Sequence, residues 1–410
     1  MKAARWDIHP RDAGLGRTLD PISRWSRLDL IERYNLAGTW ILTGPAEQLS
    51  VFGPDMGCIL DRSVEVAPNQ WVTKQVVSGQ MRTFDRTFEY DNEGRPQDVI
   101  TLGFVEDNRP LWHRLCWPDP AHPLTAAISN FPVSHDVRTG ARETIALAYI
   151  AANLGPDAPL ASRAMAELLL PTSLGRGGTT TKKARMDVLG DLVATLFEDA
   201  GLRARIVHDE STGAPLLPLL LEEVPDVSAD IIFGNSTAGR ATGAVKTWSL
   251  SYQDGEATDA IGFSAGEQEA RGASHLVNVE AETRWGGKRE VLVDQRQTDD
   301  PSDIDDALID RLTEGASPVS VEFAVAPGSD LVDRVDYDLG YRLGIELPSL
   351  PVPLSDNRMR ERSTVVEAAR PEDVSIVVGT PGAQTKRATT AEHKRLNKTL
   401  KRLALIERSR

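Results

Sequence analysis

The stretch from Gly262 to Gly266 reads Gly-Phe-Ser-Ala-Gly and fits the G-x-S-x-G pattern of serine hydrolases. In such an enzyme the serine lies on a strained turn between a strand and a helix, and an acid and a histidine follow it in the chain. Here only His275 and His393 follow Ser264, one in the next expected strand and one in a basic C-terminal segment. The chain also lacks an alternating βαβ pattern before the motif. We therefore favour a glycine-rich turn and keep a serine hydrolase as the alternative.

Other residue types that carry chemistry are scattered. No HExxH or HxxxH pair occurs, so the histidines predict packing or loop roles, no metal site and no cofactor. The seven histidines are His9, His113, His122, His135, His208, His275 and His393.

The stretch from Gly175 to Lys183 is rich in Gly and Thr and superficially suggests phosphate binding, but it does not match the GxxxxGK[ST] loop. It predicts a mobile surface loop. Cys58 and Cys116 lie far apart and outside any CxxC pair, so two buried thiols are favoured over a disulfide.

The composition is that of a globular protein, with 40% hydrophobic and 26% charged residues in a chain of 410. Residues 386–410 hold nine Lys or Arg and two Glu, a net charge of +7; the other 385 residues hold 37 basic and 58 acidic side chains, a net charge of −21. An acidic body is not expected to adhere to nucleic acid. No run of about 18 apolar residues and no apolar signal segment occurs, so we expect a soluble chain made in a cytoplasm, with no membrane anchor.

Short strands with turns between them fill the first part of the chain. The run Gly38–Thr43 reads as a strand that ends at Gly44-Pro45, and Cys58–Leu60, Trp71–Val77 and Asp98–Val105 continue the pattern. Five or six such strands favour a small barrel or sandwich. Farther on, an apolar stripe from Asp187 to Ala200 predicts a helix that Gly201 caps.

A joint between regions is expected at Glu282–Asp300. Gly286-Gly287 supplies a turn, Val291–Val293 reads as a short buried strand, and Pro301 with its neighbouring acids opens a helix. The expected segments are an N-terminal arm at 1–25, a first β-rich domain at 26–120, an α/β middle at 121–300, a second β-rich domain at 301–380 and a basic C-terminal helix at 381–410.

That last helix, within 391–407, has one apolar face and one basic face. The apolar spacing resembles a short coiled coil, which favours contact with a partner or with copies of itself; packing on its own body and contact with DNA are the alternatives. The residues that would make this contact are Leu396, Leu400, Leu403, Ile406, Lys401 and Arg402.

Several local patterns occur in an order that resembles the siphovirus gp-thirty-seven-like tail proteins of actinobacterial phages, which are similar to the baseplate hub proteins of contractile phages. The resemblance runs from about Arg33 to Gly379. The Leu339-Gly340-Tyr341 turn departs from the family's L-G-D, and the final helix is more basic than expected. The patterns are Arg33-Tyr34-Asn35 with Gly38–Leu42, Gly57-Cys58-Ile59, Ser78-Gly79, Gly103–Asp107 with Pro118-Asp119-Pro120, Gly140–Thr144 with Asn153–Pro156, Ala184–Leu189, Trp285–Glu290 with Val293–Arg296, and Tyr337–Gly340.

This resemblance implies an α+β, baseplate-hub-like fold with two small β-barrel or β-rich domains around the α/β middle and a short C-terminal helix. It implies a structural virion protein without enzymatic activity, a homotrimer at the distal tip of a siphophage tail. Three chains with two barrels each would adapt sixfold tail rings to a threefold central fibre or spike, and DNA would pass through the lumen without specific binding. The implied partners are the distal tail protein ring, the C-terminus of the tape-measure protein and the central fibre or spike. A hydrolase that assists host entry is the alternative.

Overall fold

The computed structural model describes residues 4–379 apart from short gaps. The gaps are residues 19, 92, 125–129, 212, 235–241, 253–254, 268–270, 296–300, 316–318, 327–328, 330, 348–353, 355, 368–369 and 371. The expected C-terminal helix and its six contact residues lie outside the described residues. None of the described helices is long and apolar enough to cross a membrane.

Internal contacts divide the chain into two units. Unit 1 comprises residues 1–247, 323–347 and 357–377, and unit 2 comprises residues 248–322, 348–356 and 378–410. Each unit is therefore built from segments that lie far apart in the sequence.

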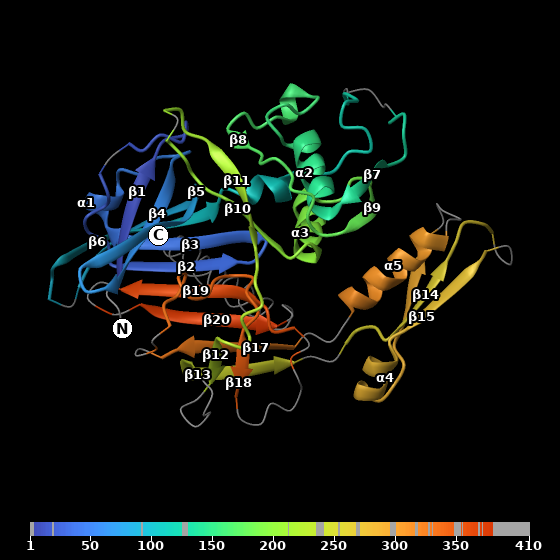
Figure 1. The fold of residues 1–410 in the computed structure, drawn as a ribbon. Coiled ribbons are helices and arrows are strands. Elements are labelled where there is room, and N and C mark those ends of the chain that lie inside the picture. Colours follow the sequence, from blue (N-terminus) through green and yellow to red (C-terminus); the bar gives the residue numbers. More distant parts are fainter. Residues whose placement is uncertain are drawn as a thin grey trace, which may run out of the picture. The chain divides into compact units, whose positions relative to one another are not determined.

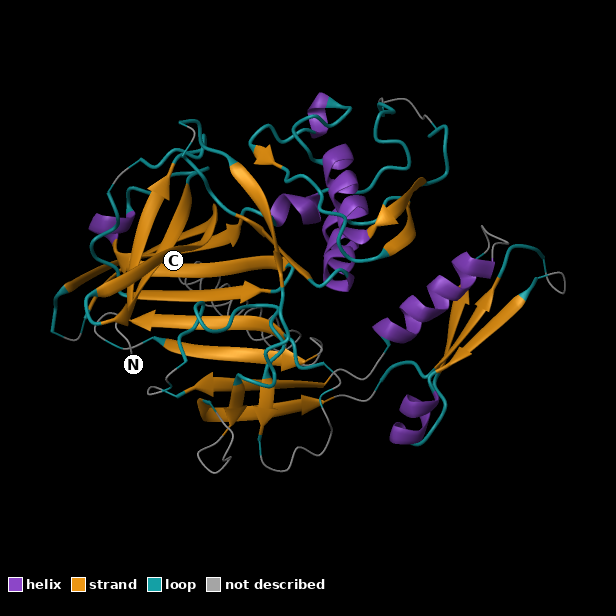
Figure 2. Ribbon diagram, in the orientation of Figure 1, coloured by secondary structure: helices purple, strands orange, loops and turns teal. Residues whose placement is uncertain are grey.

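Twelve of the described strands form the largest sheet (Figures 1 and 2), in the order β1-β4-β5-β6-β3-β2-β19-β20-β17-β13-β12-β18. Its first six strands are β1 (Ala4–Arg11), β4 (Gly57–Ala67), β5 (Gln70–Tyr90), β6 (Pro96–Glu106), β3 (Leu36–Pro45) and β2 (Arg27–Arg33). The other six are β19 (Met359–Glu367), β20 (Asp373–Gly379), β17 (Val319–Val325), β13 (Gly243–Tyr252), β12 (Ile232–Gly234) and β18 (Gly344–Glu346). The boundary between the units falls inside β13, β17 and β20.

The two sets of six strands meet at β2 and β19. These strands pair antiparallel from Arg27 opposite Glu367 to Arg33 opposite Glu361. Every second side chain is buried in β2, and also in β19 from Arg362 onward, as the period of two requires. The pairing fixes which residues of the two sets face each other.

The first set wraps around an apolar core. Trp40 stacks on Phe104 with ring centroids 5.3 Å apart, and the edge of Phe52 meets Phe104 at 5.5 Å. The short helix α1 (Ala46–Leu49) contributes Leu49, which is fully buried. Close packing of these rings sets the curvature of the strands around them.

The described strands do not close into a barrel, which corrects the barrel alternative of the prediction and leaves its β-rich alternative. The order begins at β1 and ends at β18. The outer edge of β1 is occupied by the chain that follows it, because the Ile22 N–H donates to the Ile8 carbonyl at 2.8 Å and the Thr18 N–H to the Pro10 carbonyl at 3.2 Å. This returning segment leaves β1 no free edge with which to close the set.

A mixed region of unit 1 carries its longer helices. Helix α3 (Leu189–Asp199) confirms the strongest helical prediction, and Gly201 follows it with φ of 68°, as the expected cap. Helix α2 (Arg142–Asn153) packs with α3 over an apolar core. The remaining elements here are β7 (Asp136–Ala141), β8 (Leu168–Leu169), β9 (Thr179–Ala184), β10 (Leu202–Ile206), β11 (Leu217–Glu223), and the 3-10 turns η1 (Arg109–His113) and η2 (Ala161–Arg163).

Unit 2 contains a small three-stranded sheet in the order β15-β14-β16. Its strands are β14 (Asp259–Phe263), β15 (Ala273–Val277) and β16 (Glu290–Asp294), with helices α4 (Val279–Trp285) and α5 (Pro301–Glu314). Ile304, Leu308 and Leu312 of α5 pack on this sheet. Gly286 caps α4 in the left-handed conformation, and β16 confirms the short strand expected after that glycine pair. The expected burial of Val291–Val293 was wrong, because β16 lies at the edge of the small sheet and Leu292 is 66% exposed.

Candidate functional site

Ser264 of the G-x-S-x-G motif lies in a hairpin connection between β14 and β15. Its hydroxyl donates to the Ala265 carbonyl at 3.1 Å and accepts from the Gly272 N–H at 3.0 Å. The strand that precedes it runs into a hairpin rather than into a helix. The described residues thus give Ser264 a structural role within the turn, as the favoured interpretation had it.

His275 is engaged elsewhere. It lies opposite Ile261 in the β14–β15 pair, and its Nε2 is 3.1 Å from Asp259 Oδ1. Gly262 faces α5, since a Cβ there would lie 2.9 Å from Ile304, so Ile261 and His275 face the other side of the sheet. No hydrogen bond joins Ser264 to a histidine among the described residues, so the geometry does not favour the hydrolase alternative.

The other singled-out residues have packing roles. Cys58 and Cys116 are buried free thiols, which confirms the favoured interpretation. Burial raises the pKa of Cys116 to about 12. Residues that could hold a metal ion do not cluster in the described part of the chain.

The Gly/Thr-rich loop is anchored rather than free. Arg176 pairs with Glu143 at 2.9 Å, and the Arg142 guanidinium donates to the Gly177 carbonyl at 2.8 Å. A Cβ on Gly177 would lie 2.4 Å from the Ala200 Cβ, so only glycine fits this approach. The second half of the loop forms β9, which pairs with β7.

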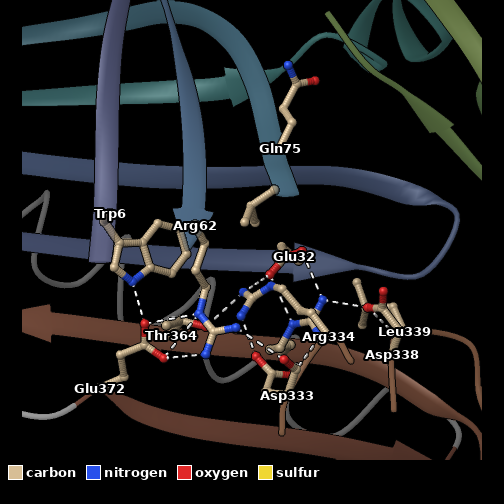
Figure 3. Close-up of polar contacts among 12 residues, drawn as sticks. Trp6, Glu32, Arg62, Gln75, Asp333, Arg334, Asp338, Leu339, Thr364 and Glu372 are labelled. Carbon is tan, nitrogen blue, oxygen red and sulfur yellow. Dashed lines mark hydrogen bonds and ion pairs between the residues drawn. The ribbon is translucent and has the colours of Figure 1, made fainter. Parts of the chain in front are cut away.

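The main polar feature of unit 1 is a buried cluster of ion pairs, which we call the arginine–carboxylate cluster (Figure 3). It joins strands from both ends of the chain and balances four guanidinium groups against four carboxylates. Its charged members are Arg62, Arg203, Arg334, Arg362, Glu32, Asp333, Asp338 and Glu372.

Arg362 of β19 is at the centre of the cluster, with a fully buried side chain. It holds Glu32 of β2 with two hydrogen bonds, both 3.0 Å, from Nε and Nη2. The same guanidinium donates to Asp333 and to Asp338 at 2.7 Å each. This forked geometry, which lysine lacks, orients three carboxylates about one residue.

Arg334 approaches from the loop between β17 and β18. It donates to Asp333 and Glu32, and its Nη2 donates to the Thr364 hydroxyl at 3.1 Å. Its backbone has φ of 62°, a left-handed conformation that is strained for a residue with a side chain. The ion pairs hold the loop in this conformation, which turns the guanidinium inward.

A second part of the cluster secures the first strands of the chain. Arg62 of β4 pairs with Glu372 at 2.8 Å and donates to the Asp333 carbonyl at 3.1 Å. The Trp6 indole N–H of β1 donates to the same Glu372 at 2.5 Å. On the opposite side, Arg203 of β10 reaches Asp338 at 2.9 Å. The cluster therefore ties β1, β2, β4, β10 and β19 together.

The charges of the cluster set its proton occupancy. Burial alone would raise the pKa of Glu32, but the guanidinium groups of Arg334 and Arg362 outweigh burial and lower this pKa to about 2. Burial also opposes the charge on Asp338, and Arg362 and Arg203 hold its pKa well below the usual range. Such carboxylates stay ionised and cannot exchange protons near neutral pH, so the cluster is suited to holding segments in register rather than to acid–base chemistry.

A cleft of about 770 Å³ opens beside the cluster within unit 1. Arg203, Arg334 and Asp338 of the cluster contribute to its wall, with charged residues of β5, β10 and β11. Both signs of charge are present, so the cleft does not have the single-sign surface that attracts a nucleic acid backbone. The other charged residues of the wall are Lys74, Arg205, Asp209, Glu222 and Glu223.

One acid near this region behaves differently. Glu106, at the end of β6, accepts from the Gly38 N–H at 2.8 Å and from the Asn108 side-chain amide at 3.2 Å. Among the described residues no arginine forms a hydrogen bond with it, and burial raises its pKa to about 7. Glu106 therefore titrates in the neutral range while the cluster stays charged.

Sequence reasoning missed the cluster, although a signal was present. Glu32 follows Leu28 and Leu30 in phase, and all three are buried. Arg62 likewise falls between the buried Leu60 and Val64. A charged side chain in the inward phase of a strand requires a buried partner, and this rule could have flagged both positions.

Comparisons with known proteins bear on the whole fold. A model of the family described as siphovirus ReqiPepy6 Gp37-like protein matches residues 11–380. A 43 kDa tail protein of prophage MuSo2 from Shewanella oneidensis has a similar fold at 11% identity, with a TM-score of 0.52 over 92% of this chain and 99% of that one. A tail protein from Neisseria meningitidis MC58 follows at 10% identity, with a TM-score of 0.50 over 92% of this chain and 97% of that one. Curated protein sequences include no significant match.

Proposed function

The chain belongs to the siphovirus ReqiPepy6 Gp37-like family, and from this premise we propose that it is a structural, non-enzymatic component of a phage tail. The two tail proteins whose fold it shares support this role. We further propose that it forms the hub at the distal tip of a non-contractile tail, with three copies in the assembled virion.

One observation carries the hub proposal. The large sheet consists of six strands from the first part of the chain followed by six from later parts, joined at β2 and β19. A chain that supplies two β-rich halves gives six halves in a trimer. Such an assembly could present six similar surfaces to a sixfold tail ring and three to a central fibre or spike.

The arginine–carboxylate cluster supports a structural role. It fixes the two sets of strands against each other with buried, oriented ion pairs whose carboxylates stay ionised near neutral pH. The charge of −21 on residues 1–385 would let DNA pass through a central lumen without adhering to its wall.

The proposed partners are the distal tail protein ring, the C-terminus of the tape-measure protein and the central fibre or spike. Removal of residues 383–410 would delete the basic segment that holds Lys401 and Arg402, and we expect it to weaken co-purification with the adjoining tip protein. Unchanged co-purification of the shortened chain would contradict a contact through this segment.

The location is tested by gold labelling of intact virions with an antibody to this chain, viewed by electron microscopy. Label confined to the far end of the tail supports the hub. Label along the whole tail contradicts the tip position while keeping the structural role. Absence of label from virions, with abundant protein in infected cells, would overturn both.

A further inference from the structure

The far end of β5 extends beyond its neighbour on one side. Strand β4 pairs with β5 only as far as Gly57 opposite Gln80, and the Met81 N–H donates to the Met56 carbonyl at 3.0 Å. After a bulge at Arg82, strand β5 pairs with β6 alone from Thr83 to Tyr90. In Figure 1 these ends of β5 and β6 project from the first set of strands. Among the described residues, no backbone group pairs with the outer edge of this segment.

All nine residues from Arg82 to Tyr90 are exposed. A strand of nine residues spans about 30 Å. A two-stranded hairpin is marginally stable alone in water, and an unpaired edge is a ready template for another strand. Natural proteins protect such edges with proline, bulges, covering loops or charged side chains. No proline, bulge or covering loop occurs between Thr83 and Tyr90 among the described residues, so the protection there comes from the charges of Asp85, Arg86 and Glu89 alone.

The side chains above this edge sort by face. Phe84, Phe88 and Tyr90 share one face with Arg86, which pairs with Asp98 of β6. The three aromatic side chains are 44%, 57% and 68% exposed, and Phe88 and Tyr90 meet edge to face at 5.4 Å. The other face carries Asp85 and Glu89 with two threonines. The edge therefore combines unpaired backbone with an aromatic row on one face and acidic side chains on the other.

We propose that the edge from Arg82 to Tyr90 is a docking site for an extended strand of a different protein, one with apolar side chains on one face and Lys or Arg on the other. An unpaired row of N–H and C=O groups is satisfied by another extended backbone, and the alternating side chains select the sequence. This inference does not depend on the tip position proposed above.

Charge disfavours a second copy of this chain as the occupant. Two identical edges pair antiparallel about a twofold axis that passes beside one central residue. A residue a given number of positions before the central one then lies opposite the residue the same number of positions after it, on the same face of the sheet. A register centred at Asp85 places Asp85 opposite its own copy, and a register centred at Arg86 does the same with Arg86. A centre at Phe84 opposes Arg82 to Arg86, one at Thr87 opposes Asp85 to Glu89, and one at Phe88 opposes Asp85 to Asp91. Each of these five symmetric registers thus sets like charges directly opposite, which destabilises a sheet.

The test uses the full purified chain and a labelled nine-residue peptide of alternating Lys and Val, followed by fluorescence anisotropy. A second peptide with five Lys followed by four Val has the same composition and charge without the alternation. We expect the alternating peptide to bind at least tenfold more tightly than the block peptide. Equal binding of the two peptides would overturn the proposal.

Three variants locate the binding. F84S/F88S/Y90S should weaken it at least tenfold, and D85K/E89K should reverse a preference for the Lys–Val peptide over a Glu–Val peptide. A shortened hairpin, in which Asn-Gly replaces residues 87–99 between the paired Arg86 and Ile100, should abolish binding. The matched control Leu174→Ser changes a side chain that is 73% exposed elsewhere in unit 1 and should bind as the wild type does.

Two outcomes overturn the proposal even when the peptide binds. Unchanged binding by the shortened hairpin would place the site elsewhere. A wild-type dimer in sedimentation velocity that the shortened hairpin dissociates would make a second copy the occupant.

Discussion

Unit 1 and the small sheet of unit 2 hold their polar groups in opposite ways. In the arginine–carboxylate cluster, Glu32 and Arg334 are 302 residues apart, and Arg62 and Glu372 are 310 apart. In unit 2, Asp259 is held by His275 and Lys288, 16 and 29 residues away. The ion pairs of unit 1 therefore join segments from opposite ends of the chain, whereas those of the small sheet join residues that are close in the sequence.

The burial of the partners differs as well. Both sides of the Arg362–Glu32 pair are buried, with side-chain exposures of 0% and 4%. Asp259 is also buried, but the side chains of His275 and Lys288 are 48% and 55% exposed. Solvent can therefore replace a lost partner in unit 2, whereas the cluster in unit 1 has no such substitute.

The chain enters and leaves the small sheet at one point. The Glu256 N–H donates to the Gly315 carbonyl at 2.8 Å. The first and last residues of this element therefore lie next to each other, as they do in an element that can be inserted into a loop. The comparison teaches that the large sheet of unit 1 depends on contacts between distant segments, whereas this element has its own small core.

The largest expected effect comes from Arg362→Met. It leaves Glu32, Asp333 and Asp338 buried without their shared guanidinium, and we expect unit 1 to lose about 3–5 kcal/mol of unfolding free energy in urea. Arg86→Met is the matched control, because it breaks an exposed pair with Asp98 and should cost about 0.5 kcal/mol or less. A loss below about 1 kcal/mol for Arg362→Met would remove the contrast between buried and exposed pairs.

The second largest effect is expected from lowering the pH, which protonates Glu32 and lowers the free energy of unfolding. Its folded pKa of about 2 lies below the ordinary 4.5, so its stabilising contribution is fully present above pH 4.5 and is lost as the pH falls toward 2. The depression corresponds to about 3 kcal/mol at most. Urea unfolding from pH 5 to pH 2 should show this loss in the wild type and a shallower slope in Glu32→Gln. Identical slopes would contradict an ionised Glu32 in the cluster.

Glu106 should give stability the opposite dependence on pH. Its folded pKa of about 7 exceeds the ordinary 4.5, so the folded state binds the proton more tightly and stability falls as the pH rises from 4.5 to 7. Glu106→Gln should stabilise the protein by about 1–2 kcal/mol at pH 8 and leave it nearly unchanged at pH 4. Equal effects at both values would show that hydrogen bonding to Gly38, rather than charge, decides the difference.

The smallest effect is expected from excision of residues 257–314, with a short Gly-Ser linker between Glu256 and Gly315. Because the two ends already meet, the free energy of unfolding of unit 1, measured in urea, should change by less than about 1 kcal/mol. Deletion of residues 357–377, which removes β19 and most of β20, is the contrasting variant and should abolish cooperative unfolding. Loss of cooperative unfolding in the excised chain would show that unit 1 depends on the inserted element.

Much of the local structure followed from the sequence. The apolar stripe of α3 with its Gly201 cap, the strand β16 after Gly286, and many strands of the first set were predicted from period and turn chemistry. The order of local patterns was enough to identify the family that the family model confirms. The five-segment division of the chain and the six contact residues of the final helix remain predictions.

What the sequence by itself determined was the buried face of regularly alternating segments such as β2, because a period of two needs only neighbouring residues. It placed Glu32 and Arg62 in an inward phase without naming their partners. Only the tertiary structure brought Arg362, Arg334 and Glu372 to them across some three hundred residues. The physical reason is that pairing between distant strands depends on the register of the whole sheet, which no local stretch of sequence specifies.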